Sequence, residues 1–417
     1  MNIPDKISES LTKAIYSMSV SVFLKPTKNK HIGKIAGIEN LPPKGPYIII
    51  ANHESFFDHF LTASVNYYIF NQKVYFLTRK ESFETYHSRI WHNATNCIPI
   101  DRDKPDINSF RQIFKVLQEG NIIVIYPEGT RGTGDALLPF KIGAFRIASR
   151  MKVPIIPVGI TGSRFVIPKG ARWFKNTTAK ISYGEAIMPE TIKNLSIEDL
   201  MTMSEIKVKM LSHENTSPSN DANAVRKTTA YLIGICEEKL ESLLLTFDVE
   251  SNHQKVVVLD EITNILEMVG VNEPDNVEIR VLKARVLGLK LMSKGLIFWL
   301  ANFWKIPKMV KEIFQIDPNH PFGHYIKGRY AMKISSLVGG NVSTALQSFD
   351  EAYQSAPKYQ IEPSTFAMAY AEALEKGGKK NDALRLLTTV QEIDDAGNLR
   401  IINRKEKARV LFQRMSA

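Results

Sequence analysis

Short apolar runs alternate with helical stretches between residues 46 and 185, and this alternation predicts a layered α/β domain. The strand-like runs are residues 47–51, 74–77, 98–100, 122–126, 155–160 and 180–183. Among the intervening stretches, Asp106 can begin a helix and Gly120 can end it. The apolar face of that helix comprises Phe110, Ile113, Phe114 and Leu117. The pattern does not give the order of the strands in the sheet.

From about residue 255 onward the chain has a helical pattern throughout. Turn signals recur at intervals of about forty residues, at 317–319, 355–357 and 394–397. Small residues followed by larger apolar ones repeat between these turns, and this permits close helix pairing. The region resembles degenerate tetratricopeptide repeats, which implies a surface that binds a protein partner. An ordinary helical bundle that supports the first domain is the alternative.

A polar segment at residues 213–221 interrupts both patterns and predicts an exposed linker or long loop. We therefore expect an N-terminal amphipathic helix and basic segment at 1–34, an α/β domain at 35–225 and a helical domain at 226–417. The expected fold class is an α/β domain with a mixed sheet flanked by helices, followed by an all-α, repeat-like domain.

The N-terminal segment carries an apolar stripe at three- and four-residue steps, followed by lysines at 25–34. The stripe comprises Ile7, Leu11, Ile15, Met18 and Val22. It suits a helix lying in a membrane interface, or equally a helix packed on its own domain.

The densest aromatic run of the chain is residues 296–304, which is too short to span a bilayer. We expect this run to form a buried helix of the repeat region rather than a membrane contact, since apolar segments of this length are common in cores.

The formal net charge of +11 belongs almost entirely to the first 190 residues, which carry +10. This asymmetry favours a phosphate-bearing ligand, an anionic membrane surface or nucleic acid as the partner of that part. Two distant cysteines argue against a disulfide framework and favour a reducing, intracellular location. The sequence has neither a membrane-spanning apolar run nor the order of a secretory signal.

His53 and Asp58 follow the strand-like run 47–51 and are the strongest candidates for proton transfer. On a regular helix, positions five apart point about 140° away from each other, so these side chains meet only if the chain turns between them. A strand-to-helix loop supplies such a turn. The carboxylate would then hold one ring nitrogen and leave the other free to act as a general base. Ser55 and Asp58 also form a Ser-x-x-Asp helix-capping pattern, and both roles can coexist.

Two further loops after predicted strands carry polar groups. Arg102 follows the run 98–100, and residues 126–132 read Tyr-Pro-Glu-Gly-Thr-Arg-Gly. Glycine lets a ligand approach the backbone, and a guanidinium matches phosphate oxygens. The sequence lacks a P-loop and a dinucleotide-binding glycine motif, so nucleotide binding is unsupported.

Four blocks, taken in order, resemble the glycerolipid acyltransferase family typified by 1-acyl-glycerol-3-phosphate acyltransferases. The blocks are Asn52–Asp58, Ile98–Arg102, Tyr126–Arg131 with Leu138–Ala144, and Val153–Val158. The likeness covers roughly residues 35 to 190. One departure is Asn96 or Cys97, where many members have a glycine.

The resemblance implies transfer of a fatty acyl group from acyl-coenzyme A or acyl carrier protein to a hydroxyl of a lysophospholipid, at the cytoplasmic face of a membrane. His53 would be the catalytic base and Asp58 would orient it. The residues that match the acceptor- and phosphate-binding blocks are Arg102, Glu128, Gly129, Thr130 and Arg131, with Lys141 as a weaker candidate. The resemblance implies no bound cofactor, no metal and no nucleic-acid partner.

Two rival functions stay open. His53, Asp58 and His59 faintly resemble a zinc motif of metallohydrolases, although position 55 is serine where that motif has a ligand. A membrane-associated scaffold without turnover is the second rival, and the intact pair of His53 and Asp58 argues against it. Acylation of an acceptor without glycerophosphate is an alternative within the family.

Overall fold

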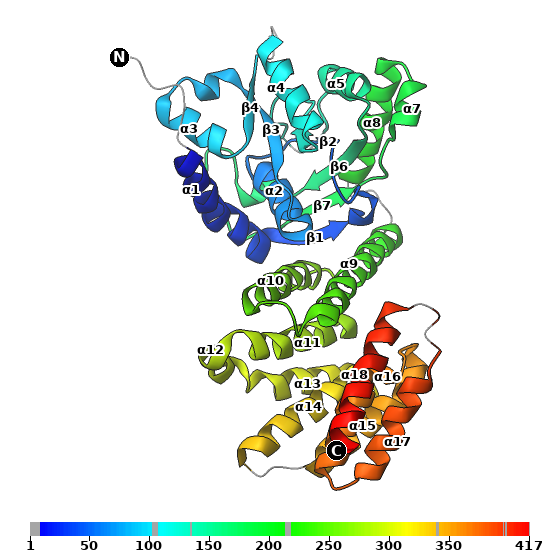
Figure 1. Ribbon diagram of the computed structural model, residues 1–417. Helices are drawn as coiled ribbons and strands as arrows, with labels where there is room; N and C mark the ends of the chain where they lie inside the picture. Colours follow the sequence, from blue (N-terminus) through cyan, green and yellow to red (C-terminus); the bar gives the residue numbers. More distant parts are fainter. Residues whose placement is uncertain are drawn as a thin grey trace. The chain divides into compact units, whose positions relative to one another are not determined.

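The computed structural model describes residues 9–101, 107–133, 136–212, 218–338, 342–394, 396 and 398–416. Two compact units form (Figure 1): one comprises the described residues up to Leu232 with Glu267–Glu273, and the other comprises Ile233–Leu266 with the described residues from Pro274 onward. The domain boundaries expected at residues 34 and 225 stay predictions. Arg102, Asp106, the core of the expected linker at 213–217 and part of the turn at 394–397 lie outside the described residues.

A seven-stranded mixed sheet forms the centre of the N-terminal unit, with strand order β1-β7-β6-β2-β5-β3-β4. Its strands are β1 Ile32–Ala36, β2 Tyr47–Ala51, β3 Val74–Arg79, β4 Cys97–Ile100, β5 Ile122–Ile125, β6 Ile155–Thr161 and β7 Ala179–Tyr183. Only the pair β6 and β7 is antiparallel among the described strand pairs. The expected mixed α/β class is confirmed.

Helices flank this sheet. They are α1 Glu9–Ser19, α2 Phe57–Phe70, α3 Tyr86–Ala94, α4 Ile107–Gln118, α5 Gly143–Met151, α6 Ser163–Val166, α7 Pro189–Lys193 and α8 Ile197–Ser212, and the long α9 Pro218–Thr246 follows them. Two π-helical segments, Val20–Leu24 and Thr27–His31, connect α1 to β1. Helix α4 has the apolar face that the sequence predicts, since Ile113 and Leu117 are buried on it.

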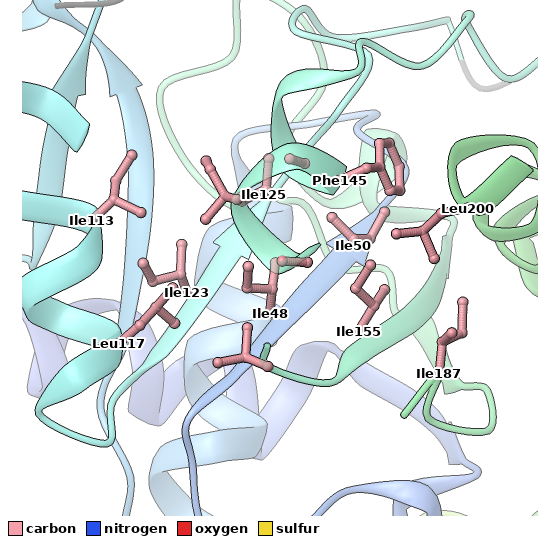
Figure 2. Close-up of a cluster of buried hydrophobic side chains, with 14 of the residues drawn as sticks. Ile48, Ile50, Ile113, Leu117, Ile123, Ile125, Phe145, Ile155, Ile187 and Leu200 are labelled. Carbon is pink, nitrogen blue, oxygen red and sulfur yellow. The ribbon is translucent and has the colours of Figure 1, made fainter. Parts of the chain in front are cut away.

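One core lies between the sheet and helices α4, α5 and α8 (Figure 2). Ile48 and Ile50 of β2 point into this core, as do Ile123 and Ile125 of β5. Because successive strand residues point to opposite faces, Tyr47 and Ile49 are buried on the other face, where the Tyr47 hydroxyl bonds Asn66 of α2 at 3.3 Å. Strands buried on both faces explain why the sequence shows continuous apolar runs rather than alternation.

The sequence did not predict β1. Ile32–Ala36 contains a glycine and a lysine and pairs only with β7 among the described strands, at the edge of the sheet. A short edge strand of this composition lacks the apolar run that marks the other strands. Its first three residues, 32–34, fell in the segment 1–34 that we expected to be an N-terminal amphipathic helix and basic segment.

The second unit is entirely helical in its described part. Its helices are the C-terminal part of α9, then α10 Asn252–Val269, α11 Val277–Ser293, α12 Gly295–Asn302, α13 Lys305–Ile316, α14 Pro321–Val338, α15 Val342–Ser355, α16 Ser364–Lys376, α17 Lys380–Glu392 and α18 Leu399–Ser416. From α13 to α18, each helix packs on the next one along the chain. This order suits a repeat, but the likeness to tetratricopeptide repeats stays a prediction.

The expectation that residues 296–304 form a buried helix is wrong. Helix α12 contains no buried residue, and Leu296, Ile297, Leu300 and Trp304 are 70%, 87%, 61% and 63% exposed. The neighbouring helices α11 and α13 bury their apolar faces instead.

No helix within the described parts of the chain is both long enough and apolar enough to cross a bilayer.

Candidate active site

The pairing of β2 with β5 brings the two motif-bearing loops together. These strands are parallel neighbours, with Ile50 opposite Ile125, so both end at the same edge of the sheet. The loop after β2 carries His53, and the loop after β5 begins at Tyr126. Ligands and catalytic groups collect at this edge in α/β folds because the loops converge there.

His53 and Asp58 meet as the sequence predicts. The ring Nδ1 of His53 lies 2.8 Å from Oδ2 of Asp58. The same carboxylate oxygen accepts the backbone N–H groups of Glu54 at 2.8 Å and Ser55 at 2.9 Å. Three donors on one buried oxygen hold the carboxylate in place and make His53 Nδ1 a donor, which leaves Nε2 as the acceptor.

The predicted capping role of Ser55 and Asp58 is also present. The Asp58 carboxylate accepts the Ser55 amide, and Ser55 Oγ accepts the Phe57 amide at 3.2 Å where α2 begins. Ser55 Oγ also donates to the carbonyl oxygen of Ile167 at 2.7 Å. One short loop therefore starts the helix and positions the imidazole.

Aromatic rings fix the orientation of His53. Tyr126 stacks on the imidazole with ring centroids 4.2 Å apart and an interplanar angle of 17°. His59 meets it edge-on at 5.3 Å. Burial, together with the nearby His53, lowers the pKa of His59 to about 3, so this second imidazole stays neutral at physiological pH. Its neutrality avoids a like charge beside His53 when that ring accepts a proton.

Glu128 ties the two loops to each other. Its Oε1 accepts the His53 backbone N–H at 2.7 Å, and its Oε2 accepts the Leu138 N–H at 2.9 Å. In return, the Gly132 N–H donates to the carbonyl oxygen of His53 at 2.7 Å. Burial raises the pKa of Glu128 above its ordinary value, although these amide donors oppose the shift. The described hydrogen bonds of Glu128 thus position the backbone at His53 and Leu138.

The other predicted anion-binding residues surround the same loop. Gly129 has φ of +74°, and a Cβ there would lie 3.0 Å from the Lys141 side chain, so glycine permits this close approach. The Arg131 guanidinium lies over the Phe56 ring, 3.9 Å from its centroid. Gly129, Thr130, Arg131 and Lys141 all line the cavity that contains His53.

The cavity has a volume of about 980 Å³ and extends from His53 into an apolar region. His53 is 9% exposed, so its ring is nearly buried yet lines the cavity. Aromatic rings form one wall, where Phe23 stacks on Phe60 at 4.7 Å and contacts Trp91 and Phe174 edge-on. A cavity of this size, with polar groups at one end, suits an amphiphilic ligand.

Glu54 lies next to the pair of His53 and Asp58 and is mostly buried. Burial and the negative charge of Asp58 raise its pKa to about 7. Its Oε2 atom is buried without a hydrogen-bond partner among the described residues, which suits a carboxyl group that readily takes up a proton.

Among the described residues, no group of three or more histidine, cysteine or acidic side chains is placed to hold a metal ion.

Several lining residues were missed from the sequence. Phe23 and Leu24 come from the N-terminal segment, and Trp173 and Phe174 come from the loop before β7. The aromatic pair at 173–174 in an otherwise polar loop was an available signal. The stacking of Tyr126 on His53 depends on strand order, which the sequence did not give.

Comparisons with known proteins indicate the family of this chain. A family model described as Acyltransferase matches residues 33–161. A 1-acyl-sn-glycerol-3-phosphate acyltransferase of Bacillus subtilis is 30% identical over 173 residues, which are 41% of this chain and 82% of the relative. A yeast protein of the same description is 36% identical over 143 residues, 33% of this chain and 45% of the relative.

A chloroplastic protein of Brassica napus with the same enzyme name is 27% identical over 174 residues, covering 41% of this chain and 47% of that protein. This chain therefore spans under half of the yeast and Brassica napus relatives. A crystal structure of a 1-acyl-sn-glycerophosphate acyltransferase from Thermotoga maritima is 25% identical and covers 48% of this chain and 77% of that one, with a TM-score of 0.39.

Proposed function

This chain belongs to the glycerolipid acyltransferase family, and from that premise we propose that it moves a fatty acyl group from an acyl thioester to a hydroxyl of a lysophospholipid. It is an O-acyltransferase of lipid biosynthesis. The proposed acceptor is 1-acyl-glycerol-3-phosphate, the substrate in the names of its relatives. The observation that carries the proposal is His53 at the cavity, with Nδ1 held by Asp58.

In the proposed reaction, His53 Nε2 removes the proton of the acceptor hydroxyl as its oxygen attacks the thioester carbonyl. Asp58 keeps the ring in the correct tautomer and stabilises the imidazolium that forms. The tetrahedral intermediate then collapses, the carbon–sulfur bond breaks, and the imidazolium returns the proton to the leaving thiolate. The products are an ester and a free thiol, and no covalent enzyme intermediate is required. Neither a metal nor a bound organic cofactor takes part in this scheme.

The acceptor phosphate is proposed to bind at the loop after β5. Arg131 offers a forked donor there, Lys141 adds a point charge, and the backbone at Gly129 can approach closely. Stacking on Phe56 holds the Arg131 guanidinium in place without using its N–H donors. Arg102 and Thr130 stay predicted members of this site.

The fatty acyl chain of the donor is proposed to lie along the aromatic wall. Phe23, Phe60 and Phe174 present stacked and edge-on rings to the cavity that His53 lines. Burial of an alkyl chain against such rings supplies binding free energy in proportion to the apolar area removed from water. The donor itself, acyl-coenzyme A or acyl carrier protein, is the choice that the experiment below resolves.

We propose that the enzyme works peripherally at the cytoplasmic face of a membrane. Leu11, Met18 and Val22 of the predicted N-terminal stripe are 43%, 50% and 41% exposed, and Ile7 lies outside the described residues. Exposed lysines Lys25 and Lys30 follow them. An apolar stripe flanked by lysines suits a surface of anionic lipid.

The experiment that tests the function is a substrate panel. Purified protein is incubated with palmitoyl-coenzyme A or palmitoyl-acyl carrier protein and with lysolipids that carry or lack a phosphomonoester, and products are identified by mass spectrometry. The proposal predicts phosphatidate from 1-acyl-glycerol-3-phosphate. Ester formation only on acceptors without glycerophosphate would contradict the proposed substrate, and no ester from any pair would contradict the proposed activity.

A further inference from the structure

Helix α12 of the helical unit is apolar yet unburied. Six of its eight residues are leucine, isoleucine, phenylalanine, tryptophan or alanine, and none of the eight carries a charge. None of the eight is buried either, whereas α11 buries Val281 and Ala284 and α13 buries Ile306 and Val310. Exposed large apolar side chains gathered on one short segment mark an interaction site rather than ordinary surface.

The residues of α12 divide into two faces. The inner face packs through Trp299 and Phe303, whose rings stack at 4.3 Å, and Phe303 in turn stacks on Tyr330 of α14 at 4.6 Å. At 3.6 residues per turn, Leu296, Ile297 and Leu300 fall within about 100° of one another, and their mean direction lies about 90° from that of Trp299 and Phe303. We call these three residues, with Trp304 just after the helix, the apolar face of α12.

The charged residues near this face in the sequence are all basic. Residues 279–311 contain eight lysines and arginines and no acidic residue. Some of these cations are paired within the unit, since Asp260 bonds Lys290 at 2.6 Å and Lys294 at 3.1 Å. Lys305 and Lys308, one and four residues after Trp304, are exposed. An apolar face next to exposed lysines complements a layer of acyl chains beneath anionic headgroups.

We propose that the apolar face of α12 inserts shallowly into an anionic lipid surface and forms a membrane contact of the helical unit. The occupant is lipid, because lysines beside an uncharged apolar helix match anionic headgroups above hydrocarbon, and because Trp304 is of the residue type enriched at that boundary. An eight-residue helix is about 12 Å long, so it can lie in one leaflet but cannot cross the bilayer.

This contact is separate from the stripe on α1 and does not depend on the proposed acyl transfer. The lipid contact is measured by vesicle binding alone, so a negative result in the substrate panel does not contradict it. In the same way, a negative result in the vesicle experiment does not contradict the acyltransferase assignment.

The test places an environment-sensitive fluorophore on the apolar face. The label is attached to full-length protein that carries Ile297→Cys. Cys97 is replaced by serine so that it does not react, and Cys236 is kept because it is buried. The labelled protein is mixed with vesicles of phosphatidylglycerol and phosphatidylcholine. The matched control is Val249→Cys in the same background, since Val249 is 84% exposed in the same unit. We expect a blue shift and quenching by lipid-borne nitroxide at position 297, and neither at position 249.

Several results would overturn the proposal. Vesicle binding that leaves the label at 297 in water would show that the chain binds through another segment, such as α1. A label at 297 that is already shielded without vesicles would show that protein covers the face, and a dependence of that shielding on protein concentration would identify a second copy. Equal binding to vesicles of phosphatidylcholine alone would remove the role of the lysines.

A second set of variants measures the contribution of the face to affinity. Leu296→Ser, Ile297→Ser and Leu300→Ser combined should lower partitioning into anionic vesicles by about tenfold or more, because each loses apolar area that would enter the bilayer. The control is Val249→Ser with Leu399→Ser, two exposed apolar residues elsewhere in the unit. An equal loss in both sets, or none in the first, would contradict the proposal. Circular dichroism checks that both sets stay folded.

Discussion

At the scale of single residues, three contacts position His53. Asp58 fixes Nδ1 at 2.8 Å, Tyr126 covers one ring face at 4.2 Å, and Glu128 holds the backbone N–H at 2.7 Å. Such pre-organisation means that the proposed proton transfer at His53 needs little reorganisation. This explains how a residue on a loop can serve as a base of defined orientation.

Replacing Arg131 with alanine tests the phosphate site. We expect the variant to lose about 1.5 to 3 kcal/mol of binding to acceptors that carry a phosphate, because charge-assisted hydrogen bonds of that size are removed. The readout is kcat/KM for lysolipids with and without a phosphomonoester. Arg111→Ala, an exposed arginine that does not line the cavity, is the control. An equal loss on both acceptor types would contradict this role for Arg131.

Glu54 predicts a pH dependence of stability. Its pKa is about 7 in the folded protein and about 4.5 as a free side chain, so between these values the folded state binds more protons than the unfolded state. Stability is therefore full below about pH 4.5 and falls as the pH rises through 7. The shift corresponds to about 3 kcal/mol at most.

Glu54→Gln should remove this loss, so its thermal midpoint should fall less than that of the native protein between pH 5 and about pH 8. Glu84→Gln, at an exposed position, should follow the native protein. Parallel curves for Glu54→Gln and the native protein would show that this carboxyl group does not titrate as the structure indicates.

The sequence predicted the contact between His53 and Asp58 because both lie within six residues at one strand-to-helix junction, where local geometry suffices. It did not predict the stacking of Tyr126, the neutral His59 or the bonds of Glu128 to backbone. Those depend on which strands are neighbours and on burial, and neither is a local property. The roles assigned to Glu128, Thr130, Arg131 and Lys141 in acceptor binding stay predictions.

At the scale of elements, the loops after β2 and β5 form one cross-linked unit. Asn52 at the end of β2 also pairs with the backbone of Ile160 in β6, at 2.8 Å and 2.7 Å. The loop that carries His53 is therefore tied to both strands that flank β2. A change in the loop after β5 should reach the imidazole through Glu128.

Glu128→Gln tests this coupling. The carboxylate of Glu128 accepts hydrogen bonds from the N–H groups of His53 and Leu138, but the NH₂ group of a glutamine cannot accept. One of these two hydrogen bonds is then lost, so we expect the free energy of unfolding to fall by about 1 to 3 kcal/mol. We also expect kcat to fall more than KM rises, because His53 shifts while the acceptor residues stay. Glu119→Gln, at an exposed position before β5, is the control. A native kcat together with native stability would show that the hydrogen bonds of Glu128 do not position His53.

Strong apolar runs made six of the seven strands predictable, and the helical periodicity made α4 predictable. Strand β1 was missed because a short edge strand needs no apolar run. The burial of α12 was predicted wrongly because apolar content alone cannot tell a core helix from one that its own unit leaves exposed. Composition shows that a segment prefers an apolar environment. Only the packing shows whether the segment's own unit provides that environment.

At the scale of the whole molecule, a short segment far along the chain belongs to the N-terminal unit. Residues 267–273 contribute Asn272, whose side chain accepts the Ile35 N–H at 3.1 Å and donates to the Ile35 carbonyl at 2.9 Å. Glu267 pairs with Lys28, whose side chain is 5% exposed. A truncation at residue 255 would therefore remove contacts of the acyltransferase unit itself and would not isolate the role of the helices.

Asn272→Ala should weaken the edge of the sheet. The substitution leaves both backbone groups of Ile35 without these partners, so we expect local opening of β1 to become easier by about 1 to 3 kcal/mol. Hydrogen exchange of a peptide containing residues 32–36 measures this directly. Exchange as slow as in the native protein would contradict it, and exposed Asn319→Ala provides the control.

The central claim is that His53 is the base in acyl transfer, and steady-state turnover of His53→Ala tests it most directly. The measurement uses an acyl thioester and 1-acyl-glycerol-3-phosphate, with exposed His87→Ala, outside the cavity, as the matched control. We predict that kcat falls by about 10² to 10⁴-fold in His53→Ala, equivalent to roughly 3 to 5.5 kcal/mol, while the variant stays folded and turnover of the control is normal. Turnover of a folded His53→Ala variant within about twofold of the native rate, a difference worth about 0.4 kcal/mol, would contradict the account.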